Sequence, residues 1–173
     1  MGIRNYLIEG VSGTGKTSVA EELERRGYHV VHGDRVLAYQ GDPETGAPLD
    51  NDTSQRYAGD LAFLQQHHIW DLAKVRAVIA DHSHPVSFFC GGSRNFHRFI
   101  DLLDDVFVLE VDPATLERRL LGRVDEWGSQ PEERALVLRV QASGEDTPAV
   151  GMRVDARRPL TQVVEAILAG TSR

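Results

Sequence analysis

The stretch that decides the fold is YLIEGVSGTGKTSVA, residues 6–20. A short, mainly apolar run with the look of a buried strand leads into a loop with three glycines, and a run typical of a helix follows. Residues 10–17 match the pattern G-x-x-x-x-G-K-[ST] in full. Glycine permits positive φ, so the loop can turn its N–H groups inward, and these groups with the following helix N-terminus form an anion pocket. The stretch therefore predicts a phosphate-binding loop.

This loop predicts specific contacts to a nucleotide. Lys16 can reach the β- and γ-phosphates, and the Thr17 hydroxyl can coordinate Mg²⁺. A chance match of this pattern is expected in on the order of one per cent of chains of this size, and here the match also lies between a strand and a helix. We expect ATP and Mg²⁺ as cofactors, and the nucleotide contacts predicted from the loop are Gly10, Ser12, Gly13, Thr14, Gly15, Lys16, Thr17 and Ser18.

Length and charge limit the class of protein. The chain has 173 residues, which predicts one domain over 1–173. Its one cysteine, Cys90, excludes an intrachain disulfide and indicates a reducing compartment. No segment has the features of a signal peptide or a membrane span, so we expect a cytoplasmic protein with no membrane partner. The net charge of −7 disfavours nucleic-acid binding but allows a small phosphate ligand at a local cluster of arginines.

Short strand-like runs alternate with helical runs along the chain, as in βαβ units. Residues 39–56 are polar and rich in turn formers, so an irregular excursion is expected there, and residues 55–82 read as one or two helices. The pattern predicts an α/β fold, a doubly wound parallel sheet with helices on both faces. The five predicted strands lie at about 6–9, 28–31, 85–90, 106–111 and 152–156.

Four further segments carry a family resemblance: VVHGDRVL (30–37), FFCGGSRN (88–95), LERRLLGR (116–123) and VDARRPLTQVVEAIL (154–168). In this order they resemble the adenylate-kinase-like group of P-loop kinases, which includes nucleoside monophosphate, shikimate and gluconate kinases. The resemblance implies a three-layer P-loop NTPase fold with strand order 2-3-1-4-5. It also implies transfer of the ATP γ-phosphoryl group to a hydroxyl or phosphate of a small molecule, by a monomer or homodimer.

On the acceptor side, Gly33-Asp34 is similar to the Gly-Asp pair that opens the acceptor site in nucleoside monophosphate kinases. Asp34 is expected to hold the Mg²⁺ shell or to accept the proton of an acceptor hydroxyl, although it could also be a helix N-cap. Arg94 is expected to clamp an anionic group of the acceptor, unless it is simply an exposed loop arginine. The acceptor region is expected at about 35–72. The predicted substrate-binding residues are His32, Asp34, Arg35, Gly91, Gly92 and Arg94.

On the nucleotide side, the resemblance places Arg119 and Arg123 at two arginine positions four apart on one helix face. One packs on the adenine, and the other touches phosphates from a short lid at about 123–134. The loop at 155–159 would touch the base, mainly through its backbone, and Arg157 is assigned to nucleotide binding. The predicted catalytic residues are Lys16, Asp34, Arg119 and Arg123.

Two departures from the family pattern bear on the acceptor. Cys90 stands where nucleoside monophosphate kinases have an aspartate that supports the metal, so Asp34 is expected to be the sole carboxylate near the magnesium. Leu37 stands where adenylate kinases have an acceptor-binding arginine, so the acceptor need not be AMP. His68 is expected at the surface with most of the other histidines. Trp70 and Trp127 could stack on a base or a sugar face, and Trp70 could equally be a core residue.

The main alternative is a P-loop ATPase or nucleotide-dependent switch that acts on a protein or RNA. A GTPase would need an Asn-Lys-x-Asp segment, which the sequence lacks. An AAA-type ATPase would need an acidic pair after the third strand, where the sequence has Cys90, Gly91 and Gly92. A nucleotide-binding protein without catalysis is a third possibility.

Overall fold

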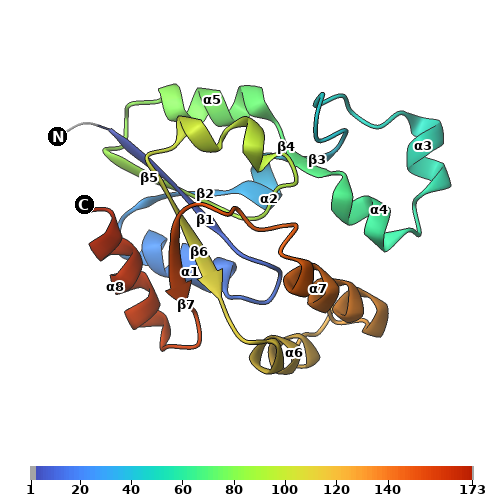
Figure 1. Ribbon diagram of the computed structural model, residues 1–173. Helices are drawn as coiled ribbons and strands as arrows, with labels where there is room; N and C mark the ends of the chain where they lie inside the picture. Colours follow the sequence, from blue (N-terminus) through green and yellow to red (C-terminus); the bar gives the residue numbers. More distant parts are fainter. Residues whose placement is uncertain (1–2, 173) are drawn as a thin grey trace.

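A computed structural model describes residues 3–172 and has a five-stranded parallel sheet at its centre (Figure 1). The strand order is β2-β5-β1-β6-β7. Numbered within this sheet alone, the order is 2-3-1-4-5, so the predicted fold class is confirmed. The strands are β1 (Arg4–Glu9), β2 (His29–His32), β5 (Val86–Cys90), β6 (Asp105–Glu110) and β7 (Met152–Asp155).

The central strand β1 is buried on both faces, because it is covered by helices on either side of the sheet. Tyr6 and Ile8 belong to one apolar cluster, together with α1 (Lys16–Arg25) and α8 (Leu160–Gly170). Leu7 points to the other cluster, which includes residues of α5 (Leu72–Ala80). Figure 1 shows α5 on one side of the sheet and α1 and α8 on the other. The alternation along β1 thus produces the predicted three layers.

The helices after β6 begin at strong local signals. Helix α6 (Pro113–Leu121) follows Asp112, whose carboxylate accepts a hydrogen bond from the Thr115 N–H at 2.9 Å. Helix α7 (Pro131–Ser143) starts in a capping box formed by Gln130 and Glu133. The segment between these helices, 122–130, contains most of the predicted lid. Among residues 3–172, no helix combines the length and apolar character that a membrane span requires.

The excursion between β2 and α5 was only partly predicted. It contains α2 (Gly33–Val36), α3 (Asn51–Arg56), α4 (Leu61–Gln66) and an antiparallel pair, β3 (Ala38–Gln40) and β4 (His68–Trp70). The prediction of an irregular segment at 39–56 and helices over 55–82 was therefore wrong at β3, α3 and β4. Each strand has three residues, too few for a periodic signal, and the pairing joins Gln40 to the distant His68. Figure 1 shows α3 and α4 standing away from the main sheet.

Two short 3₁₀ turns, Phe96–Arg98 and Ile100–Leu102, connect the end of β5 to β6. The buried side chain of Asn95 precedes them and fixes this connection to β4: Asn95 Oδ1 accepts a hydrogen bond from the Trp70 N–H at 3.0 Å, and Asn95 Nδ2 donates to the Trp70 carbonyl at 2.9 Å. The ends of β2, β4 and β5 are thereby held together beside the phosphate loop.

Candidate active site

The phosphate loop, residues 10–17, lies between β1 and α1 as predicted. Lys16 Nζ donates to the Val11 carbonyl at 3.1 Å and also to the Gly10 carbonyl, so the lysine lies over the loop. Gly13 has φ of +95°, and a Cβ there would stand 2.7 Å from Leu116 Cδ1. Only glycine therefore suits a loop that must both turn its amides inward and approach α6 this closely.

A cavity of about 1000 Å³ opens at this loop, and we call it the phosphate-loop cavity. Asp34, Arg35 and residues of the closing helix α8 contribute to its wall. Most of the residues that the sequence assigned to a nucleotide line this one space: Ser12, Gly13, Thr14, Gly15, Lys16, Thr17, Ser18, Arg119 and Arg123.

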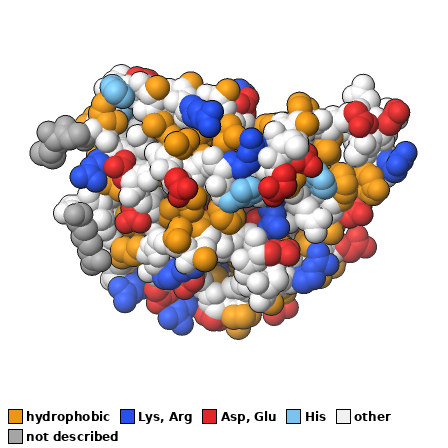
Figure 2. Space-filling model, turned by 45° about the horizontal axis from the view of Figure 1, so that its top comes forward, with side chains coloured by type: hydrophobic (Ala, Val, Ile, Leu, Met, Phe, Trp, Pro, Cys, Tyr) orange, Lys and Arg blue, Asp and Glu red, His pale blue; other side chains and the backbone are white. Residues whose placement is uncertain are grey.

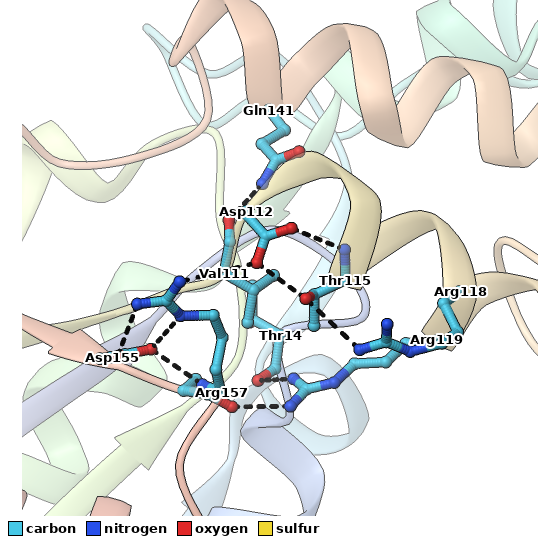
Figure 3. Close-up of polar contacts among 10 residues, drawn as sticks. Thr14, Val111, Asp112, Thr115, Arg118, Arg119, Gln141, Asp155 and Arg157 are labelled. Carbon is cyan, nitrogen blue, oxygen red and sulfur yellow. Dashed lines mark hydrogen bonds and ion pairs between the residues drawn. The ribbon is translucent and has the colours of Figure 1, made fainter.

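Arg119 joins three segments on one side of the cavity. Its Nη1 donates to the Thr14 carbonyl at 3.0 Å, and its Nη2 donates to the Ala156 carbonyl at 2.7 Å (Figure 3). The guanidinium thus holds the phosphate loop next to the loop that follows β7. Arg118 instead donates to the Thr115 hydroxyl at 3.4 Å and does not line the cavity.

Arg123 reaches the phosphate loop from the segment after α6, not from the helix. The helix ends at Leu121, so the prediction that Arg119 and Arg123 share one helix face was wrong. Nevertheless, Arg123 Nη1 donates to the Ser12 hydroxyl at 2.9 Å and also to the Trp127 carbonyl. The segment 122–130 is therefore tied directly to the phosphate loop, and both arginines line one cavity.

Arg157 does not line the phosphate-loop cavity, unlike its neighbours Ala156 and Arg158. Its Nε and Nη2 donate to the Asp155 carboxylate at 2.8 and 2.9 Å, and its Nη1 lies 3.9 Å from Asp112 (Figure 3). The two arginines differ because the Asp155 and Asp112 carboxylates hold the Arg157 side chain away from the cavity. The structure therefore favours Arg158 over Arg157 as the side chain of this loop that faces the nucleotide.

A second cavity of about 460 Å³ lies on the other side of Lys16. Its walls come from segments that are far apart in the sequence. Besides Gly10 and Ser12 of the phosphate loop, the lining residues are Lys16, Asp34, Gln40, Leu64, Gln65, His68, Gly92, Ser93, Arg94, Trp127 and Asp146.

Asp34 lines both cavities and is held by two contacts, one from β4 and one from the turn after β5. Its Oδ1 lies 3.2 Å from His68 Nε2 and accepts a hydrogen bond from the Gly92 N–H at 3.2 Å. Burial raises the pKa of Asp34, but the His68 hydrogen bond, the charge of Lys16 and the Gly92 N–H outweigh it and hold this pKa below its usual range. Asp34 is thus an ionised carboxylate between the two spaces.

The glycines around Asp34 make room for a buried indole. Trp70 is fully buried and stacks on Phe99, so it is a core residue. A Cβ at Gly33 would stand 2.0 Å from Trp70 Cζ2, and one at Gly91 would stand 2.8 Å from the same atom. The Gly33–Asp34 and Gly91–Gly92 segments therefore both pack directly against the Trp70 indole.

Arg94 lines the second cavity, where the sequence placed an anion clamp, but its guanidinium already has an anionic partner. Arg94 Nη1 lies 3.0 Å from Asp146 Oδ1, and both side chains are only 15% exposed. Asp146 follows α7, far from Arg94 in the sequence. Burial raises the pKa of Asp146, and the Arg94 hydrogen bond and charge oppose that shift. This pair is the clearest departure of the site from the expected one.

His32 and His68 both differ from expectation, since His32 was expected at the acceptor site and His68 at the surface. His32 lines neither cavity, and its Nε2 lies 3.0 Å from Glu24 on α1. The prediction that His32 faces the acceptor is not supported, because the last residue of β2 points toward α1. His68, expected at the surface, instead contacts Asp34 inside the second cavity.

The expectation that no acid other than Asp34 lies near the end of β5 was wrong. Glu9 is fully buried, and its Oε1 accepts a hydrogen bond from the Gly10 N–H at 2.9 Å. Oε1 would also stand 3.1 Å from a Cβ placed at Gly92. Burial raises the pKa of Glu9 well above its usual value, although the charge of Lys16 opposes this. Glu9 is therefore a buried acid beneath the phosphate loop, and its burial favours the neutral form.

Cys90 is also buried, and burial raises the pKa of its thiol. The thiol is therefore neutral and offers no charge to a metal. Among residues 3–172, no group of three or more His, Cys, Asp or Glu is arranged to hold a metal ion. Thr17 and Asp34 do line the phosphate-loop cavity together. A hydroxyl and an ionised carboxylate are hard oxygen ligands that suit Mg²⁺ when phosphates supply the other oxygens.

The residues that sequence reasoning missed are His68, Gln40, Gln65 and Asp146. None has a local motif, and all reach the second cavity through the excursion or the turn after α7. In the view of Figure 2, acidic and basic side chains are intermingled, without the continuous basic stripe typical of nucleic-acid binders.

The comparisons with known proteins start from the family. A family model described as an AAA domain, AAA_18, matches residues 7–136, which is well over half of the chain. The chain belongs to this AAA domain family. The matched region contains the phosphate loop, the excursion, β5, β6 and α6. A sequence comparison with curated proteins found no match.

Solved structures of small-molecule kinases share this fold over the full chain. A gluconokinase from Sinorhizobium meliloti 1021 is 23% identical with a TM-score of 0.59, over 98% of this chain and 92% of that one. A shikimate kinase from Bacteroides thetaiotaomicron is 13% identical with a TM-score of 0.61, over 98% and 99%. A deoxyadenosine kinase from M. mycoides, with bound dATP, is 15% identical with a TM-score of 0.53, over 98% and 100%. The resemblance to adenylate-kinase-like proteins is thereby confirmed at the level of the fold.

Proposed function

We propose that the protein is an ATP-dependent kinase that transfers the γ-phosphoryl group of ATP to a small-molecule acceptor. The observation that carries the proposal is the meeting of two cavities. The phosphate-loop cavity and the second cavity share Ser12, Lys16, Asp34 and Trp127 in their walls. In phosphate loops of this kind the lysine contacts the β- and γ-phosphates of bound ATP. The γ-phosphate would therefore face directly into the second cavity.

The proposed reaction is a single in-line displacement. An acceptor oxygen attacks the γ-phosphorus, the bond from phosphorus to the β-phosphate oxygen breaks, and ADP leaves with the bonding electron pair. The ionised carboxylate of Asp34 orients the acceptor hydroxyl and takes its proton as the new bond forms. Lys16 and Arg123 stabilise the charge of the transferring group. Each group lines the phosphate-loop cavity.

The nucleotide would be held by the inward amides of the loop and by Arg119. Thr17 and Asp34 are the residues that would hold Mg²⁺, which supplies charge neutralisation at the phosphates when bound. The segment 122–130 is tied to Ser12 through Arg123, so it is the proposed lid that excludes water from the transfer. The excursion at 35–72 is the proposed acceptor region.

The description of the family as an AAA domain favours one alternative, an ATPase that acts on a macromolecule. Two features argue for a kinase instead. Strand β5 ends in Cys90 and two glycines, without an acidic pair that could activate water. The second cavity has the size of a small ligand and shares Lys16 and Asp34 with the phosphate-loop cavity.

Acceptor-dependent release of ADP separates the two functions. The purified protein with ATP and Mg²⁺ would be tested against nucleosides, nucleoside monophosphates, sugar acids and neutral sugars. A kinase gives ADP release that rises at least tenfold with an acceptor and yields a phosphorylated product. ADP release that depends on an added protein or RNA, with no response to any small acceptor, would support the ATPase.

A further inference from the structure

The second cavity has no free positive charge for an anionic acceptor. Three of its lining side chains can be cationic: Lys16, His68 and Arg94. Lys16 lies over the phosphate loop, where a nucleotide phosphate would take its charge. His68 Nε2 faces Asp34 Oδ1 at 3.2 Å, so any charge on its ring is balanced there. Arg94 therefore decides whether the cavity can receive a carboxylate or a phosphate.

The Arg94 charge is compensated inside the protein. Its partner Asp146 lies 3.0 Å away, and both side chains are only 15% exposed. Water screens this pair only weakly, so its two opposite charges interact strongly with each other. The pair therefore presents no net charge to a nearby ligand. An anionic acceptor would have to approach the carboxylates of Asp146 and Asp34 within the same enclosed space, which is unfavourable.

A neutral amide contributes to the wall of the cavity. Gln40 is the last residue of β3 and lines the cavity, although its Oε1 is itself buried and has no hydrogen bond to any described residue. Amide side chains carry no charge and form hydrogen bonds with hydroxyl groups, so Gln40 offers nothing that would neutralise a carboxylate or a phosphate.

The remaining surfaces fit the same kind of ligand. Leu64 and Trp127 give the cavity apolar walls, and Gln65 supplies a second amide. Carboxylates such as Asp146 accept hydrogen bonds from hydroxyl groups, as amides do. We infer, on the basis of the proposed kinase function, that the acceptor is a neutral molecule with several hydroxyl groups, and that the Arg94–Asp146 pair excludes carboxylated and phosphorylated acceptors.

Two sources share this chemistry: a nucleoside and an uncharged sugar or sugar alcohol. The test uses pairs that differ by one anionic group, such as deoxyadenosine against dAMP and glucitol against gluconate, with kcat/KM from ADP release. We expect kcat/KM at least tenfold higher for the neutral member of whichever pair is used. A preference for the anionic member would overturn this inference and leave the kinase proposal intact. No acceptor-dependent release for any compound would overturn both.

The variant Asp146→Asn tests the pair itself. It keeps the shape of the side chain but leaves the Arg94 charge uncompensated. We expect the ratio of kcat/KM for the neutral member to that for the anionic member to fall at least tenfold. The matched control is Glu145→Gln, the same change at an exposed neighbour that lines neither cavity. An unchanged ratio in Asp146→Asn, with its melting temperature preserved, would show that the pair does not select the acceptor.

Discussion

The phosphate-loop cavity and the second cavity are built in opposite ways. The first is built around one contiguous stretch, residues 12–19, and is completed by residues of α2, α6, the segment after α6, the loop after β7 and α8. The second takes its walls from β3, α4, β4, the turn after β5 and the turn after α7. A site made by backbone in one short segment is encoded locally, whereas a site made by side chains from many segments depends on how the whole chain folds.

The largest expected effect is the loss of Lys16, one of the four residues that line both cavities. Replacing Lys16 with methionine removes the charge at the transferring phosphoryl group, and we expect kcat to fall about 1000-fold, which is about 4 kcal/mol. The measurement is acceptor-dependent ADP release. Lys74→Met on the exposed face of α5 is the control and should keep the wild-type rate. A Lys16 variant with near-normal kcat would remove this residue from the mechanism.

The next variant separates the two cavities. Asp34→Asn keeps the size of the side chain but removes the charge, so we expect kcat with an acceptor to fall about 100-fold. The dissociation constant for ATP should change by less than about threefold, because the phosphate loop is intact. Steady-state kinetics give kcat, and a nucleotide titration gives the dissociation constant for ATP. Unchanged turnover would contradict the role of Asp34, and an equal loss of ATP affinity would contradict the separation.

The contrast between the cavities also explains what the sequence could predict. The five strands and the phosphate loop follow from local pattern, because buried apolar runs and a glycine-rich loop leave clear signals, whereas the strand order followed from the family resemblance. Arg123 was expected on a helix, and only the end of α6 at Leu121 shows that it lies beyond. The direction of Arg157 depends on its pairing with Asp155, and a short loop gives no periodicity from which to read it.

The second cavity was beyond prediction for a physical reason. His68 and Asp146 have no motif, and each reaches its partner only through a distant pairing, to Asp34 and to Arg94. Three-residue strands such as β3 and β4 are fixed by each other and by Trp70, not by local propensity. The region that the sequence indicated, 35–72, supplies Gln40, Leu64, Gln65 and His68 to the second cavity, but the sequence did not indicate which side chains face inward.

A stability variant tests the packing of Gly33, the neighbour of Asp34, against Trp70. In Gly33→Ala the new Cβ would stand 2.0 Å from the buried ring of Trp70. We expect the free energy of unfolding to fall by about 1–3 kcal/mol, since a packed core does not accept extra volume. Chemical denaturation gives the value. Gly59→Ala, where a Cβ would meet nothing within 4 Å, is the control. Equal stability of the two variants would contradict this packing.

The smallest expected effect concerns the acid beneath the phosphate loop. The pKa of Glu9 is raised well above its usual value in the folded protein. The folded state therefore holds a proton that the unfolded state loses, and stability falls as the pH rises from about 4.5 toward the folded pKa. In Glu9→Gln this decline should be smaller. Unfolding free energies measured across pH 4.5 to 8 test it, and parallel curves for the two proteins would argue that Glu9 is ionised in the folded state.

The central claim is that the two cavities form one transfer site, and the fate of the γ-phosphoryl group tests it most directly. ATP labelled at the γ-position would be incubated with the protein, Mg²⁺ and a panel of neutral nucleosides and sugars, and the label would be traced. The account predicts that the label appears on an acceptor hydroxyl and that this transfer is lost in Asp34→Asn. Label recovered only as inorganic phosphate, at a rate unaffected by every acceptor, would contradict it.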